Sequence, residues 1–211
     1  MTTPAFPVIL AAPSGTGKTT IARRLLELRP DVGFSVTCTT RAPRPAETHG
    51  VDYFFLAEPE FEARVGLGDF AEHALVHGKR YGTLRSEIDR LMAAGRNPIM
   101  TIDVQGAVQF VRAFPEAVLV FLLPPSAVEL LARLSARGSE DRATLATRVD
   151  SALMELTTID QFEYVVVNDA LDHAVAQVLS IIDAEALRRT RLTDLTERVT
   201  ALANELRDAI R

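Results

Sequence analysis

Residues 12–19 read Ala-Pro-Ser-Gly-Thr-Gly-Lys-Thr, follow a short apolar run and precede a segment with helical spacing. Phosphate binding needs small residues that let backbone N–H groups turn toward an anion, a lysine for the outer phosphates and a hydroxyl for Mg²⁺. Here the glycines are Gly15 and Gly17, the lysine is Lys18 and the hydroxyl belongs to Thr19. The pattern therefore predicts a Walker A loop that binds ATP, at the N-terminus of a helix that also favours anions.

The loop departs from the general pattern at Ala12, where a first glycine is usual. Without that position, average residue usage gives a bare Gly-Lys-Ser/Thr in about one chain in ten. The preceding strand, the following helix and Gly15 distinguish the segment from an ordinary strand–turn–helix. GTPases also carry an Asn-Lys-x-Asp segment, which this sequence lacks, and the chain is too short for a mechanical ATPase. A kinase of small molecules is the remaining prediction.

The composition is that of a globular protein, with 47% hydrophobic and 24% charged residues in a chain of 211. The formal net charge is −5, from 23 basic and 28 acidic residues, which does not favour nucleic acid as a partner. The one cysteine, Cys38, cannot form a disulfide within the chain, and no apolar run approaches the ~20 residues of a spanning helix. We expect a cytoplasmic protein with no membrane partner, no structural zinc site and no tightly bound organic cofactor.

The elements that must position the loop alternate between short apolar runs and longer segments with helical spacing, which predicts an α/β fold. The apolar runs are typical of parallel strands covered on both faces. They span residues 8–11, 99–102, 118–122 and 164–167. The predicted helices span residues 19–28, 106–113, 127–136, 143–156 and 171–189. Residues 1–34 and 96–189 thus form the predicted core.

Residues 35–95 break this rhythm, because prolines and glycines are frequent and polar and aromatic residues are mixed. We interpret the stretch as an inserted subdomain that carries substrate specificity. A second feature is the polar segment between the predicted helices 127–136 and 143–156, which predicts a lid over about residues 137–150.

The C-terminal residues 190–211 predict an amphipathic helix with apolar residues spaced 3, 4, 3, 4 and 3 apart. These are Leu192, Leu195, Val199, Leu202, Leu206 and Ala209. The stripe covers only two and a half heptads. It leaves two alternatives, packing back on the protein's own sheet or forming a homodimer through this helix.

Beyond the loop, a series of segments resembles guanylate kinases, in the same order along the chain. The matching segments lie within residues 35–44, 50–55, 70–73, 78–83, 102–107, 124–126, 133–138 and 167–169, with Arg148 and Glu155 between the last two. The resemblance covers about residues 8–189. It implies a P-loop kinase core with a parallel sheet flanked by helices, an inserted small mixed α/β subdomain that binds GMP, and a helical lid.

The resemblance implies transfer of the γ-phosphoryl group of ATP to GMP or dGMP, giving ADP and GDP in purine nucleotide metabolism and GMP recycling. Mg²⁺ is expected to arrive with ATP. A P-loop kinase of a phosphorylated sugar is one alternative, although it gives no reason for the guanine-binding residues below. An interaction module that keeps the fold without catalysis is another, although such a module is expected to have a damaged phosphate loop.

For GMP, two arginines and two tyrosine hydroxyls suit a dianionic phosphate, and a buried carboxylate suits the N1–H and 2-amino donors of guanine. The predicted GMP-binding residues are Thr37, Arg41, Arg44, Tyr53, Glu72, Tyr81, Thr83 and Asp103. Many relatives have an acidic residue two positions before Asp103, where this chain has Thr101.

For ATP and catalysis, positive charge must lie where negative charge spreads during phosphoryl transfer. The predicted ATP-binding residues are Ala12, Pro13, Ser14, Gly15, Thr16, Gly17, Lys18, Thr19, Thr20, Arg137 and Asn168, the last near the adenine by resemblance. The predicted catalytic residues are Lys18, Arg41, Arg137 and Arg148. Thr19 is the predicted metal ligand, with Asp103 acting through a water molecule.

Overall fold

The main sheet of the computed structural model has five parallel strands in the order β2-β7-β1-β8-β9. The structure describes residues 3–76, 78–135 and 142–210. The strands are β1 (Val8–Ala11), β2 (Val32–Phe34), β7 (Asn97–Thr101), β8 (Val118–Leu123) and β9 (Tyr164–Val167). Four of them confirm the predicted apolar runs. β2 was not predicted, because a three-residue edge strand with a central glycine carries too short a pattern.

Helices cover both faces of this sheet, because successive side chains of each buried strand point to opposite faces. Val8 and Leu10 of β1 pack in one cluster with α1 (Lys18–Leu28) and α7 (Leu171–Ala186). Ile9 and Ala11 point the other way, into a cluster with α3 (Arg85–Ala93) and α4 (Val104–Ala113). α3 lies within the predicted 35–95 insertion, yet its Ile88 packs in this cluster of the main sheet.

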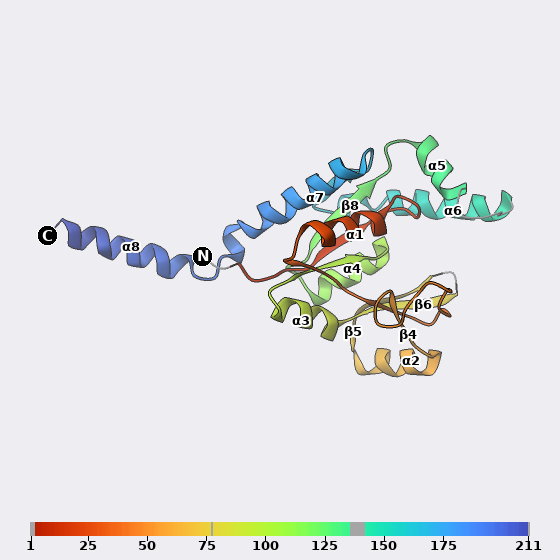
Figure 1. Ribbon diagram of the computed structural model, residues 1–211, viewed down its shortest axis with the longest axis horizontal. Helices are drawn as coiled ribbons and strands as arrows, with labels where there is room; N and C mark the ends of the chain where they lie inside the picture. The colour runs from red at the N-terminus through yellow and green to blue at the C-terminus, as the bar shows by residue number, and fades with distance from the viewer. Residues whose placement is uncertain (1–2, 77, 136–141, 211) are drawn as a thin grey trace.

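The insertion contains a second, mixed sheet in the order β4-β3-β6-β5. Its strands are β3 (Thr37–Thr39), β4 (Tyr53–Phe55), β5 (Phe70–Val76) and β6 (Lys79–Leu84), and α2 (Glu58–Leu67) covers one face (Figure 1). Phe61 of α2 stacks on Phe70 at 4.5 Å between ring centroids, with Cys38 buried in the same cluster. The α/β class predicted from the sequence is confirmed.

The predicted lid, about residues 137–150, follows α5 (Ala127–Ser135) and includes the first part of α6 (Arg142–Leu156); the two helices pack through Leu130, Leu134 and Ala152. Residues 136–141, and with them Arg137, lie outside the described residues.

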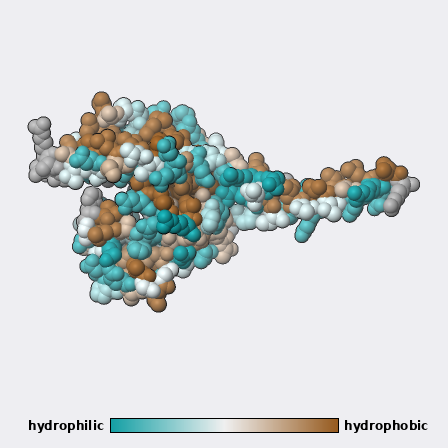
Figure 2. Space-filling view, turned by 180° about the vertical axis from the view of Figure 1, so that it is seen from behind, coloured by the Kyte–Doolittle hydropathy of each residue, from teal (hydrophilic) through white to brown (hydrophobic). Residues whose placement is uncertain are grey.

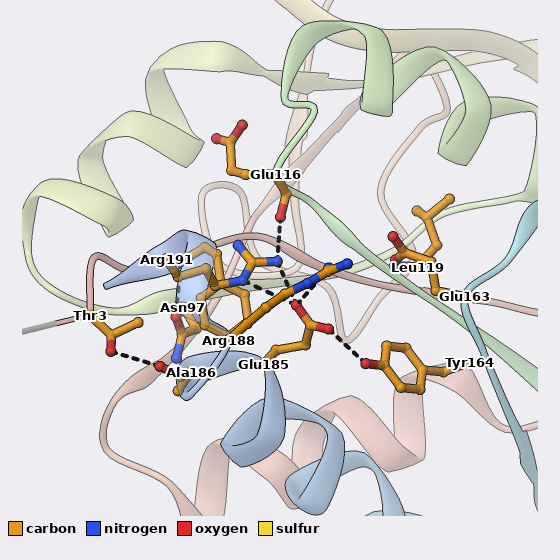
Figure 3. Close-up of polar contacts among 11 residues, drawn as sticks. Thr3, Asn97, Glu116, Leu119, Glu163, Tyr164, Glu185, Ala186, Arg188 and Arg191 are labelled. Carbon is orange, nitrogen blue, oxygen red and sulfur yellow. Dashed lines mark hydrogen bonds and ion pairs between the residues drawn. The ribbon is translucent and has the colours of Figure 1, made fainter. Parts of the chain in front are cut away.

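The end of α7 is fixed by a buried carboxylate, shown in Figure 3. Glu185 is 5% exposed and accepts hydrogen bonds from the Tyr164 hydroxyl at 2.6 Å and from the Arg191 guanidinium at 2.8 Å. Arg191 also donates to the carbonyl of Glu116 and lies 4.2 Å from the ring centre of Phe6. We call Glu185, Tyr164, Arg191 and Phe6 the base cluster. It ties the short 3₁₀ turn Arg189–Arg191 to the main domain.

Beyond the base cluster, α8 (Leu195–Ala209) leaves the domain as a projecting arm (Figure 1). None of its residues is buried. Packing back on the protein's own sheet, one of the two alternatives for residues 190–211, is therefore wrong for α8 itself, and the turn before it contacts the domain through Arg191. In the described ranges, no helix has the length and apolar character needed to cross a bilayer.

The base cluster generates a stability prediction. Arg191→Ala removes the best-placed cationic partner of a buried carboxylate, so we expect the free energy of unfolding to fall by about 2–4 kcal/mol. Arg188→Ala is the matched control, because Arg188 contacts the same carboxylate at 3.4 Å from a side chain that is 56% exposed. We expect that change to cost at most about 0.5 kcal/mol. Urea unfolding measures both, and equal losses would contradict the assignment.

Candidate active site

The phosphate loop connects β1 to α1 and turns through two left-handed glycines. Gly15 has φ of +85° and Gly17 has φ of +99°, conformations that L side chains rarely adopt. Gly17 immediately precedes the first residue of α1, so the free N–H groups of the helix N-terminus face the loop. Ala12 is fully buried in the cluster under α1 and α7, so its methyl group packs in the core where the usual pattern has glycine.

The carbonyl oxygen of Thr16 is held from two other elements. Asn168, in the loop after β9, donates its side-chain N–H at 2.6 Å, and Arg133 of α5 donates at 3.4 Å. A methyl group on Gly17 would lie 2.7 Å from the Asn168 amide nitrogen. Asn168 therefore supports the loop directly in this structure, while its predicted contact with adenine stays a prediction.

Lys18 and the lid helix also contact the loop. The Lys18 ammonium donates to the carbonyl of Ala12 at 2.5 Å, which keeps its charge at the loop. The Glu155 carboxylate, near the end of α6, accepts the Ser14 backbone N–H at 3.3 Å. Arg148 of α6 donates to the carbonyl of Leu134 in α5 at 2.9 Å. α5, through Arg133, and α6, through Glu155, are thus both joined to the phosphate loop.

In the second sheet, the predicted GMP-binding side chains share the face opposite α2. Alternation places Cys38 and Phe54 under α2, so their neighbours Thr37 and Tyr53 point to the other face. Thr83 joins that face through its hydrogen bond to Glu72 in the adjacent strand. Tyr81 lies two residues before Thr83, and its ring centre is 6.1 Å from that of Tyr53. This face is the candidate acceptor site.

Glu72 is the buried carboxylate of this face, with 4% of its surface exposed. The Thr83 hydroxyl donates to it at 2.6 Å. Burial, opposed by the Thr83 hydrogen bond and aided by the negative charge of Asp103, raises the pKa of Glu72 to about 7. A buried carboxylate has lost its hydrogen bonds to water, and the N–H donors of a ligand can replace them.

Asp103 brings the second sheet into contact with the core. It precedes α4, and its Oδ1 accepts the Gly106 backbone N–H at 2.7 Å, which caps the helix. A methyl group on Gly106 would lie 2.8 Å from Glu72 Oε2, so glycine permits the close approach of the two units. β7, which leads to Asp103, pairs with β1, which leads to the phosphate loop. The two predicted substrate sites therefore meet at the carboxyl edge of the main sheet.

Arg41 lies beside the two tyrosines, with its guanidinium 5.3 Å from the ring centre of Tyr53. It donates to Glu47 at 2.8 Å, and this hydrogen bond raises the pKa of Arg41 above its ordinary value. The second oxygen of Glu47 accepts the backbone N–H of Arg44 at 2.8 Å. The Arg44 side chain is exposed at the rim. A phosphate bound here must share Arg41 with Glu47, a residue that the sequence did not single out.

Comparison with known proteins now identifies the family. The family model described as Guanylate kinase matches residues 5–185. The chain is 43% identical over 190 residues to a guanylate kinase of Thermotoga maritima, which covers 90% of this chain and 92% of the relative. It is 46% identical over 187 residues to a guanylate kinase of Anaeromyxobacter dehalogenans, and the match covers 88% of this chain and 83% of that relative. The chain belongs to the guanylate kinase family.

The solved structures agree. The crystal structure of guanylate kinase from Anaplasma phagocytophilum superposes with a TM-score of 0.78 at 30% identity, covering 93% of this chain and 94% of that one. These comparisons confirm the family resemblance that the sequence motifs indicated. They also confirm the P-loop kinase fold and the enzyme class that the resemblance implies, a nucleoside monophosphate kinase. The role of each site residue stays a prediction.

Among the residues outside the predicted guanylate kinase site, Glu47, Arg133 and Glu155 contact it through their charged side chains. Glu47 pairs with Arg41 across a proline-rich turn, where no regular spacing points to the contact. Arg133 and Glu155 lie on different helices that meet the phosphate loop only in the folded chain. The family resemblance includes both positions, but it gave them no contact with the loop, because charged residues on amphipathic helices show no partner in the sequence.

The raised pKa of Glu72 predicts how stability depends on pH. Between the unfolded value near 4.5 and the folded value near 7, the folded state binds the extra proton, so wild-type stability falls as pH rises through this window. Glu72→Gln cannot titrate and is expected to be more stable than wild type at pH 8 by about 1–3 kcal/mol, with no such advantage at pH 4.5. Urea titrations without nucleotide across this range measure it. A constant difference between the two proteins would show that Glu72 titrates normally.

The contact between Asn168 and Thr16 predicts a selective effect on ATP. Asn168→Ala leaves the Thr16 carbonyl with one long hydrogen bond, so the loop loses its fixed shape. We expect KM for ATP to rise about tenfold, with a smaller change in KM for GMP. Asp169→Ala is the control, because Asp169 is the exposed neighbour and its carboxylate contacts only Ala170 and His173 in the described residues. An equal change in both KM values would contradict a role specific to the phosphate loop.

Proposed function

We propose that this protein transfers the γ-phosphoryl group of ATP to GMP or dGMP, giving ADP and the nucleoside diphosphate. The observation that carries the proposal is the buried Glu72–Thr83 pair next to Asp103, one strand away from an intact phosphate loop. The carboxylate suits a base with paired N–H donors, and the loop suits the phosphates of a nucleoside triphosphate.

Guanine selection follows from the burial of Glu72. The N1–H and 2-amino groups of guanine are two donors on one edge, and a carboxylate accepts both. Adenine presents an acceptor at its N1 position, which would leave the buried Glu72 carboxylate facing a lone pair. Sites with paired polar groups reject analogues that lack the partner far more strongly than apolar pockets do. The Thr37 and Thr83 hydroxyls are the proposed partners of the remaining guanine atoms.

Phosphoryl transfer requires alignment and positive charge more than covalent chemistry. Lys18 sits at the loop, where the outer phosphates of ATP are expected. Arg41, with Tyr53 and Tyr81, lies on the acceptor face and is proposed to hold the phosphate of GMP, with Arg44 at the rim. Arg148 and Arg137 are proposed to add charge from the lid, although Arg137 lies outside the described residues.

Magnesium fits this site as part of the ATP complex. The described residues hold no cluster of three His, Cys, Asp or Glu side chains that binds a metal alone. Mg²⁺ keeps several waters and is commonly held by one or two protein oxygens plus the substrate phosphates. The exposed Thr19 hydroxyl, in the first turn of α1, would be the direct ligand, and Asp103 would act through water. The ion supplies neutralisation of the phosphate charge.

A coupled assay of ADP release with Mg·ATP and GMP, dGMP, AMP, UMP or CMP tests the proposal. Turnover should be confined to the guanine nucleotides. Glu72→Gln should lower kcat/KM for GMP about a hundredfold and narrow the preference over AMP, while Lys18→Ala should lower kcat at least about a hundredfold. Matched controls are Glu60→Gln on α2 and Lys79→Ala at the start of β6, both exposed and both outside the acceptor face.

Two outcomes would overturn the assignment in different ways. Tight GMP binding without turnover would indicate an interaction module of the same fold. Turnover of a phosphorylated sugar, with no binding of GMP, would show that the acceptor face has been misread.

A further inference from the structure

The projecting helix α8 carries an apolar stripe whose outer part, from Val199 onward, is exposed in the described chain, while Leu195 at its start is partly buried. Val199, Leu202 and Leu206 are 57%, 56% and 61% exposed, although they repeat at heptad spacing. Figure 2 shows hydrophobic side chains running along the arm beside hydrophilic ones. Scattered exposed leucines need no explanation, but an aligned stripe on an isolated helix marks a binding face.

An isolated helix of this length also needs a partner for its own stability. α8 has 15 residues, and helices of about 12–15 residues are marginal in water without tertiary packing. The base cluster holds only its root. The contacts that stabilise the arm must therefore come from outside the domain.

We propose that α8 pairs with α8 of a second copy of this chain in an antiparallel two-helix coiled coil. Within α8, Val199 and Leu206 take heptad position a, and Leu195, Leu202 and Ala209 take position d. Antiparallel pairing brings Val199 opposite Leu202 of the partner subunit and Leu195 opposite Leu206 of the partner subunit. Because each such contact occurs twice about a two-fold axis, the same stripe serves both chains. The inference goes beyond the proposed catalytic function and does not depend on it.

Charge selects the antiparallel direction. The two g positions of the stripe are Arg198 and Glu205. In an antiparallel pair, g positions face g positions, so Arg198 lies against Glu205 of the partner subunit, and the symmetry gives this ion pair twice. In a parallel pair, g positions face e positions of the next heptad, which are Ala203 and Ile210, and no ion pair forms. The charges therefore complement each other in only one of the two directions.

The opposite flank of the stripe permits close approach. Its e positions are Thr196 and Ala203, which face each other across the antiparallel pair. Both side chains are small, so the helices can approach on this side while the charged side chains close the other. At about 1.5 Å per residue, α8 spans about 22 Å, which places the two domains at opposite ends of the pair. The phosphate loop and the acceptor face lie away from α8 (Figure 1).

Charge reversal tests the pairing and its direction together. Arg198→Glu alone and Glu205→Arg alone each replace two attractive pairs with two repulsive ones. Each is expected to weaken dimerisation about tenfold or more at low salt. The double variant Arg198→Glu/Glu205→Arg restores the pairs and should restore the dimer. Sedimentation velocity over a concentration series measures the dissociation constants, and circular dichroism checks that the helix content is unchanged.

Two further variants complete the design. Leu202→Glu places a charge at the centre of the stripe and should give a monomer with unchanged turnover, because α8 lies outside the catalytic site. Glu197→Arg is the matched control for Glu205→Arg, since it makes the same change at the outer f position, and it should leave the dimer intact.

Three results would overturn the proposal. One is a wild-type chain that stays monomeric at about 100 μM. Another is a dimer that survives Leu202→Glu, which would place the interface elsewhere. The third is loss of the dimer on Leu202→Glu with no response to single charge reversals, which would exclude the antiparallel direction.

Discussion

The carbonyl oxygen of Thr16 is the point on which the donor site depends. A loop that turns its N–H groups toward an anion must turn some carbonyls the other way, and each of these needs a donor of its own. Asn168 and Arg133 supply those donors from the far end of β9 and from α5. The shape of the phosphate loop is therefore set by elements that follow it by more than a hundred residues, and it exists only when the sheet is complete.

In the candidate acceptor site, the buried polar group that needs partners is the Glu72 carboxylate. Burial of Glu72 costs free energy because its charge loses water, as its raised pKa shows. The Thr83 hydroxyl offsets part of this cost, and Asp103 adds to it. A ligand that presents two N–H donors would offset the remaining cost of burying the carboxylate. In the proposed function, the cost of burying the empty Glu72 carboxylate is the source of base selectivity, and Gly106 permits the close approach of α4 to this carboxylate.

Much of this arrangement could be predicted from the sequence because its signals are local. The phosphate loop, four core strands and the apolar stripe of α8 are contiguous patterns, and all appear in the structure. β2 was missed because three residues are too few to show a pattern. Whether α8 packed inward could not be predicted, because an amphipathic stripe is the same for an inward-facing and a free helix. The partners of Arg41 and Thr16 were missed because pairs such as Thr16 and Asn168 meet only through the tertiary fold.

The base cluster separates the catalytic domain from its arm. The match to the family model ends at residue 185, the carboxylate that Tyr164 and Arg191 hold, so the matched region ends where the arm is anchored. A buried ion pair is a demanding way to join two segments, because each charge must be well partnered to offset its desolvation. Its effect is to fix geometry: Arg191 also bonds the Glu116 carbonyl and packs on Phe6, so the turn before α8 is tied to two other parts of the domain. The apolar stripe is therefore presented from a fixed root, which favours one specific interface over non-specific association.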